Sequence, residues 1–155
     1  MKQVNNKKAF SMLTAIVIIV LMSSVAVFVM NISGKIVKST TAQYQNEQAE
    51  LYAKSYTEYA ILAVTGNDRA TKCLSTINGT IGTPSSGNGY VIQTEIAYIG
   101  PSSVIGNCAG TRKLSTNVTS VETPLTVVID VYVKYRDPDN TAQRRIVHRR
   151  SIQKI

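Results

Sequence analysis

The sequence is poor in the residue types that build metal centres and charged surfaces. Its 155 residues include no tryptophan, one histidine, two cysteines and four prolines, and only 17% of them are charged. Two cysteines and one histidine are too few for a zinc site with several Cys and His ligands. The composition also excludes a collagen-like chain, a coiled coil and a wholly disordered chain. The length fits one domain with an appendage.

Charge is absent from one long block near the N-terminus. Residues 9–34 contain no charged side chain, whereas the eight residues before them contain Lys2, Lys7 and Lys8 and no acid. A helix of about 25 residues is about 37 Å long, which is enough to cross a hydrocarbon core of about 30 Å. The block is longer than the apolar core of a cleaved secretory signal. We therefore expect a segment that stays in the membrane.

The lysines on either side of the block predict its orientation. Three precede the block, and two, Lys35 and Lys38, follow it. Because the more basic flank of a membrane span stays in the cytoplasm, we expect a single-pass protein with a cytoplasmic N-terminus. The rest of the chain would then lie on the other side of the membrane.

The helical pattern continues beyond the uncharged block. Residues 35–65 contain no glycine or proline, and Gly66-Asn67 is a helix stop signal. Apolar and tyrosine side chains recur there at spacings of three or four residues, at Ala49, Tyr52, Tyr56, Ala60 and Ala63, and Leu51, Tyr59 and Leu62 widen this face. The pattern predicts one helix over residues 10–65 whose second half buries a face against a domain. Tyrosines on such a face more often pack in a core than stack on nucleic-acid bases.

The C-terminal half predicts strands. Residues 90–99 and 125–136 are rich in β-branched and aromatic side chains, and the second stretch alternates Val127, Ile129, Val131 and Val133 with more polar residues. Residues 83–89 read as a loop and 137–140 as a turn, after which residues 143–152 return as the partner strand of a hairpin. The predicted fold class is α+β, with a long N-terminal α-helix packed on a small antiparallel β-sheet of about three or four strands.

The junction between the lysine-rich leader and the uncharged block carries a specific signal. In the stretch KKAFSML at residues 7–13, two lysines and the small residue Ala9 precede Phe10, which opens the apolar run. This resembles the class III signal of type IV pilins and type II secretion pseudopilins. The resemblance implies cleavage by a prepilin peptidase between Ala9 and Phe10 and N-methylation of Phe10, which leaves 146 residues (155 minus 9). The family usually has glycine where this chain has Ala9.

The fifth mature position also departs from the family pattern. The family usually has glutamate there, a buried carboxylate thought to pair with the N-terminal amine of a neighbouring subunit, and this chain has Thr14. A charge inside a membrane is costly unless it is paired, so its presence normally marks a function. Family members that lack it tend to be minor subunits, one kind of which lies at the filament tip. The alternative is that Thr14 is a tolerated variant.

The resemblance implies an organisation and a function. The regions are a leader peptide (1–9), a transmembrane helix half (10–34), an amphipathic helix half (35–66) and a globular head (67–155). The implied function is structural, as a pilin-like minor subunit of a type II secretion, type IV pilus or competence filament, without an active site or cofactor. Its partners would be other pilin-like subunits, the bacterial inner membrane and the prepilin peptidase, and its head would be periplasmic.

The two cysteines lie on the side of the membrane opposite the leader. In an oxidising compartment such as a bacterial periplasm, Cys73 and Cys108 would form one disulfide that closes a loop of about 36 residues. The alternative is a catalytic thiol, for which His148 is the only candidate base. We favour the disulfide, and we expect His148 to be a solvated residue of a basic strand.

The basic C-terminus is the surface feature with most functional promise. Its cations include Arg144, Arg145, Arg149 and Arg150. Strand alternation places Arg144 and Arg150 on one face and Arg145 and Arg149 on the other. Such a hairpin could bind DNA or another polyanion as part of a membrane-anchored periplasmic receptor. Equally, it could block sheet-to-sheet aggregation or contact acidic neighbours in a filament.

A metal site is the weakest of the candidates. Asp137, Asp139 and Asn140 offer oxygen ligands for calcium, but their spacing is not that of an EF-hand and is ordinary turn chemistry. We therefore predict no metal site. The sequence also contains no phosphate-binding loop and no nucleophile–base pair.

Overall fold

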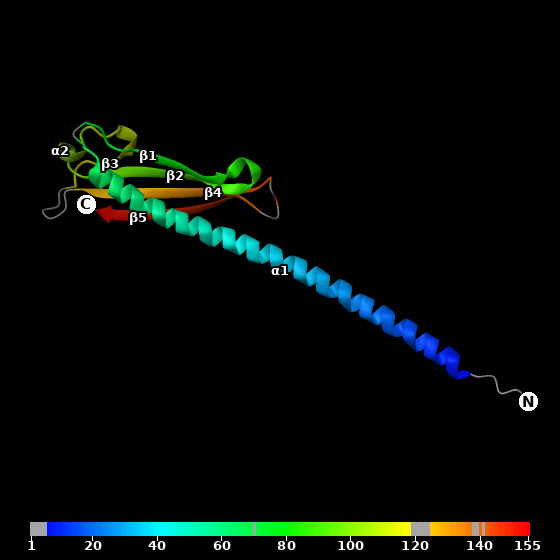
Figure 1. The fold of residues 1–155 in the computed structure, drawn as a ribbon. Coiled ribbons are helices and arrows are strands. Elements are labelled where there is room, and N and C mark those ends of the chain that lie inside the picture. The colour runs from blue at the N-terminus through cyan, green and yellow to red at the C-terminus, as the bar shows by residue number, and fades with distance from the viewer. Residues whose placement is uncertain (1–5, 70, 119–124, 138–139, 141) are drawn as a thin grey trace, which may run out of the picture. The chain divides into compact units, whose positions relative to one another are not determined.

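The computed structural model describes residues 6–69, 71–118, 125–137, 140 and 142–155, with side chains from Met12 onward. The chain divides into two compact units, Met1–Thr41 and Ala42–Ile155. We call the second the C-terminal unit. One helix, α1 (Asn6–Gly66), contributes to both units (Figure 1). The predicted continuous helix is confirmed, and it begins four residues before Phe10.

A small, mainly antiparallel sheet forms the rest of the C-terminal unit. Its strands are β1 (Thr76–Thr83), β2 (Asn88–Ile99), β3 (Lys113–Ser115), β4 (Thr126–Arg136) and β5 (Arg144–Lys154). The spatial order is β1-β2-β4-β5, and β3 pairs in parallel with the end of β2. Short helices complete the chain: η1 (Pro84–Ser86), α2 (Ser102–Ile105) and η2 (Gly110–Arg112). The α+β class is confirmed, with five strands rather than three or four.

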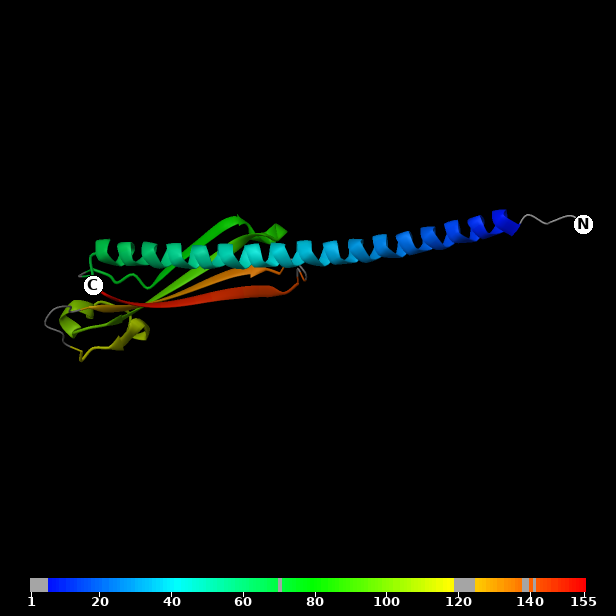
Figure 2. The same cartoon turned by 90° about the horizontal axis from the view of Figure 1, so that it is seen from below.

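The core of the C-terminal unit lies between α1 and one face of the sheet (Figure 2). Small side chains line the buried side of α1, at Ala49, Ala53, Ala60 and Val64. They face the buried row of β4, which consists of Val127, Ile129, Val131 and Val133 as the alternation predicted, together with Ile92 and Ile96 of β2. Small residues at the centre of this helix face leave room for the branched side chains of the sheet, and the close packing of the two excludes water.

Tyrosines seal this interface at its edges. The ring of Tyr90 lies 5.0 Å from that of Tyr52, and its hydroxyl donates to the Gln45 carbonyl oxygen on α1. The Tyr135 hydroxyl donates to Asn46 Oδ1, also on α1, over 3.2 Å. Burial raises the pKa of both Tyr90 and Tyr135. The hydroxyls therefore stay protonated at neutral pH and can act as the hydrogen-bond donors that join sheet to helix.

The predicted buried face of α1 was too wide. Tyr52 and Tyr56 pack against the core as expected, but Leu51, Tyr59 and Leu62 are exposed, and so is Tyr44. At about 100° per residue these four residues lie on the side of the helix opposite Ala49, Ala53 and Ala60. The sequence spacing did not separate the two faces because apolar residues occur on both.

Strand β1 was missed by the sequence analysis. Its sequence, TINGTIGT, holds two glycines and an asparagine, which are depleted in strands. The reason for Gly79 lies elsewhere in the chain, because the Tyr56 side chain occupies the space where a Cβ at this position would sit. Thus β1 can pair with β2 while Tyr56 of α1 packs against its backbone. The predicted loop at residues 83–89 is the connection between these strands, although both strands extend into it.

We predict that Gly79→Ala destabilises the C-terminal unit by about 1–3 kcal/mol, because the added methyl overlaps the Tyr56 ring and forces it to move. The matched control is Gly110→Ala, since a Cβ at that position meets no atom within 4 Å. Chemical denaturation of both variants measures the difference. Equal stability of the two variants would contradict the packing described here.

A disulfide joins Cys73 to Cys108, as predicted. It ties the segment that follows α1 to the segment that follows α2, and both cysteines are buried. Neither cysteine is a free thiol in this structure, so the alternative of a catalytic cysteine has no support. The crosslink stabilises a region that has short helices and few apolar side chains to bury.

Replacing both cysteines with serine is expected to lower the free energy of unfolding by about 3–4 kcal/mol, because the open chain regains the entropy of a loop with a sequence separation of 35 residues. Denaturation of the wild type with and without reductant checks this value independently. A loss below about 1 kcal/mol in both experiments would mean that the crosslink is not needed to hold this region.

Candidate functional site

The predicted processing site lies in the first turns of α1. Ala9 and Phe10 are both helical in the backbone, and their side chains lie outside the described part of the structure. Thr14, the fifth mature position, is exposed one turn further along the same helix. The predicted cleavage position and Thr14 therefore share one helical segment.

The uncharged block forms a helix whose described side chains are all exposed. Its large apolar side chains from Met12 to Met30 are all exposed, including Phe28 at 66%. The hydroxyls of Ser23 and Ser24 donate to carbonyl oxygens of the same helix, those of Ile19 and Leu21, each over 2.8 Å. Both polar side chains are thus satisfied without water, as a lipid environment requires. By length and composition, α1 is a candidate single membrane span.

A second apolar surface lies on the part of α1 that belongs to the C-terminal unit. We call it the apolar stripe, and it consists of Tyr44, Leu51, Tyr59 and Leu62, which are 52–69% exposed. The residues are spaced seven, eight and three apart, so they follow one side of the helix. The sheet covers the opposite side. An exposed row of large apolar side chains on a helix is a surface suited to contact with another apolar helix.

The structure separates the four hairpin arginines into two groups. Arg145 Nε donates to Asp137 Oδ2 over 2.6 Å, and Arg150 donates two hydrogen bonds to Asp130, over 2.8 and 3.0 Å. Arg144 and Arg149 have no ion pair with any described carboxylate. The register of β5 with β4 places Arg144 and Arg150 on the sheet face away from α1, which we call the outer face. The four arginines therefore do not form one continuous basic surface.

His148 belongs to the Arg150 cluster. Its Nε2 lies 2.7 Å from Asp130 Oδ1, and its ring stacks on Tyr132 at a centroid distance of 4.5 Å. The hydrogen bonds from Arg150, with a smaller contribution from His148, hold the pKa of Asp130 below its usual value, and partial burial opposes this effect. The cluster joins β4 to β5 by side chains, so its chemistry is that of a structural contact between strands.

Ionised Asp130 should stabilise the C-terminal unit at neutral pH. Because its pKa is lower in the folded than in the unfolded state, this contribution is complete above about pH 4 and disappears as the pH falls through the folded value. Asp130→Asn should therefore lower the melting temperature more at pH 7 than at pH 2. Melts of wild type and variant at both pH values measure this, with the exposed Glu58→Gln as control. An equal loss at both pH values would contradict the ionic account.

Two of the oxygen ligands considered for calcium, Asp137 and Asn140, are already engaged in hydrogen bonds within the chain. Asp137 is buried and bonded to Arg145, and Asn140 Oδ1 accepts a hydrogen bond from the Ala142 amide. Asp139 lies outside the described residues. Among the residues that the structure describes, no group of three His, Cys, Asp or Glu side chains could hold a metal ion.

Two basic residues near Arg144 were missed by the sequence analysis. Arg136 lies directly opposite Arg144 in the β4–β5 pairing, and Lys134 lies two residues further along the same face. Alternation along β4 already placed Lys134 and Arg136 on the same face of the strand. Their proximity to Arg144 depends on the register of the hairpin, which could not be derived from the sequence.

Comparison of the chain with models of protein families, with curated proteins and with solved structures finds no match.

Proposed function

We propose that this chain is a pilin-like minor subunit of a type II secretion or type IV pilus/competence filament in a bacterial inner membrane. The observation that carries the proposal is that α1 combines a candidate membrane span with a helix that packs in the core of the C-terminal unit. One uninterrupted helix begins in a lysine-rich leader, presents an apolar surface long enough to cross a membrane, and then supplies the buried helix of an α+β unit. A helix that served only as a membrane anchor would not need to continue into the core of the domain.

The leader junction supports processing of this helix. Cleavage between Ala9 and Phe10 would leave a mature chain that starts at the apolar run, with no lysine before it. The new N-terminus could then enter a bundle of apolar helices, in which close packing of helices stabilises the assembly. Thr14 cannot supply the carboxylate that would pair with a neighbouring N-terminal amine, which favours a minor subunit over the main fibre protein.

The apolar stripe supports assembly beyond the membrane. It lies on the side of α1 that the sheet leaves uncovered, so it is accessible to a neighbouring subunit. Contact there would bury Leu51 and Leu62, each of which contributes about 1.5–3 kcal/mol when fully removed from water. Helix–helix contact could thus continue from the membrane into the C-terminal unit.

The alternative is a membrane-anchored periplasmic receptor that binds DNA or another polyanion through its basic hairpin. It is the weaker proposal because Arg145 and Arg150 are already paired with Asp137 and Asp130. An anchored receptor also has no need of cleavage after Ala9 or of an exposed stripe on α1.

A photo-crosslinking amino acid placed at Leu51 in native cells tests the assembly. We expect adducts with proteins that have the same kind of N-terminus, namely a lysine-rich leader, a small residue and a long apolar run. The matched control is Leu114 of β3, another exposed leucine, which should not give these adducts. Absence of such adducts at Leu51, or equal yields at the two positions, would reject the assembly and favour the receptor.

A further inference from the structure

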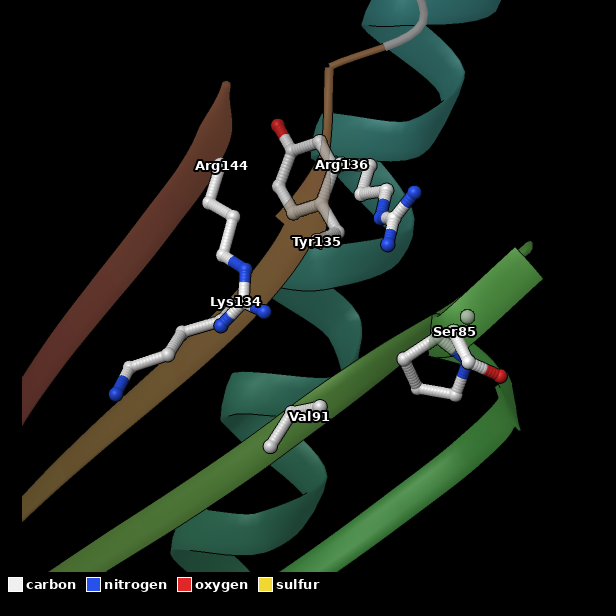
Figure 3. Close-up of a pocket in the computed structure, with 8 residues that line it drawn as sticks. Ser85, Val91, Lys134, Tyr135, Arg136 and Arg144 are labelled. Carbon is white, nitrogen blue, oxygen red and sulfur yellow. The ribbon is translucent and has the colours of Figure 1, made fainter. Parts of the chain in front are cut away.

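A depression of about 270 Å³ lies at one end of the outer face of the sheet, where the β1–β2 connection meets the β4–β5 hairpin (Figure 3). Its lining includes three basic side chains, Lys134, Arg136 and Arg144, together with Pro84, Ser85 and Val91. Arg144 reaches from β5 across β4, whereas Arg136 extends toward β2 and the connection that holds Ser85 (Figure 3). Ligand pockets for drug-sized molecules are typically about 300–1,000 Å³. The volume of this depression lies just below that range.

The three positively charged residues lie close together in the sheet although like charges repel each other. Arg136 and Arg144 are directly opposite in the β4–β5 register, and like charges in this arrangement destabilise a strand pair. Lys134 adds a third positive charge on the same face, and its only described partner is the neutral Gln93 Oε1, 3.3 Å from Nζ. No described carboxylate is paired with Arg136 or Arg144. A bound anion would remove this repulsion.

Arg136 and Arg144 differ from the other arginines beside them in whether their hydrogen-bond donors are already used. Arg145 and Arg150 each have an aspartate within 3 Å, so their donors are in use. Arg144 and Arg136 keep their guanidinium donors available beside the same depression. The planar guanidinium matches the oxygen atoms of a phosphate group in a bidentate arrangement, and an ammonium adds a point charge.

We propose that Arg136 and Arg144, with Lys134 beside them on the same face, form a binding site for a single phosphate group. Free phosphate and a phosphate in a nucleic-acid strand share this chemistry. The site can hold one phosphate group and does not extend along the strand, because the next arginine on the outer face, Arg150, is already paired with Asp130. The proposal uses only the C-terminal unit and holds whether or not the chain assembles into a filament.

The test uses the full chain in an uncharged detergent at low salt. Calorimetric titration measures the affinity for inorganic phosphate and, separately, for a short single-stranded DNA. Arg144→Gln and Arg136→Gln each remove one guanidinium from the site. The matched control is Arg149→Gln, which removes the same charge from the same strand as Arg144, but on the face toward α1 and without breaking an ion pair with a described residue.

We expect Arg144→Gln and Arg136→Gln to lower phosphate affinity roughly tenfold, since each loses a charge-assisted hydrogen bond. Arg149→Gln should change it less than about twofold by the same scale. If the variants weaken DNA in the same pattern, a nucleic-acid phosphate occupies the site; if only inorganic phosphate responds, free phosphate does. No binding of either probe, or an equal loss with Arg149→Gln, would overturn the proposal.

Thermal unfolding provides a second readout that does not depend on a single variant. Phosphate should raise the melting temperature of the wild type relative to chloride at equal ionic strength, because a ligand that binds only the folded state stabilises it. Arg144→Gln and Arg136→Gln should lose this response, and Arg149→Gln should keep it. An unchanged melting temperature of the wild type in phosphate would overturn the proposal.

Discussion

The packing of α1 on the sheet is the contact on which the rest of the C-terminal unit depends. Ala49, Ala53 and Ala60 bring the helix backbone close to the branched side chains of β4, and Tyr90 and Tyr135 donate hydrogen bonds back to the helix. With this face buried, the other side of the helix must remain outside the core. That constraint exposes the apolar stripe. The same helix also carries the apolar surface that could cross a membrane.

The two faces of the sheet carry different kinds of interaction. The face toward α1 is mainly apolar on β2 and β4 and is closed by tyrosines, with Arg145 and Arg149 at its β5 edge, whereas the outer face holds Asp130, Lys134, Arg136, Arg144 and Arg150. On the outer face, Asp130 is paired with Arg150 and lies within hydrogen-bond distance of His148, but Arg136 and Arg144 lie opposite each other without a described acid. Arg150 therefore helps to hold the edge strand β5 to β4, whereas Arg144 remains available to bind a partner.

The elements that follow from local pattern were predictable, and those that depend on a distant side chain were not. Helix α1 and strands β2 and β4 follow from periodicity, from the absence of glycine and proline, and from alternation. Strand β1 was not predictable, because Gly79 makes sense only with Tyr56 packed against it. The exposed stripe was assigned to the buried face because apolar residues occur on both sides of α1. The cluster of Arg136 and Arg144 required the register of the β4–β5 hairpin, which the turn residues alone do not specify.

Intact mass and N-terminal sequencing of the protein from its native membrane test the central claim most directly. If α1 assembles as a pilin-like helix, the chain begins at Phe10, carries one additional methyl group on its N-terminal amine, and retains the leader only when the prepilin peptidase is deleted. A chain that still carries residues 1–9 in cells with active peptidase would contradict the account and leave α1 as a permanent anchor.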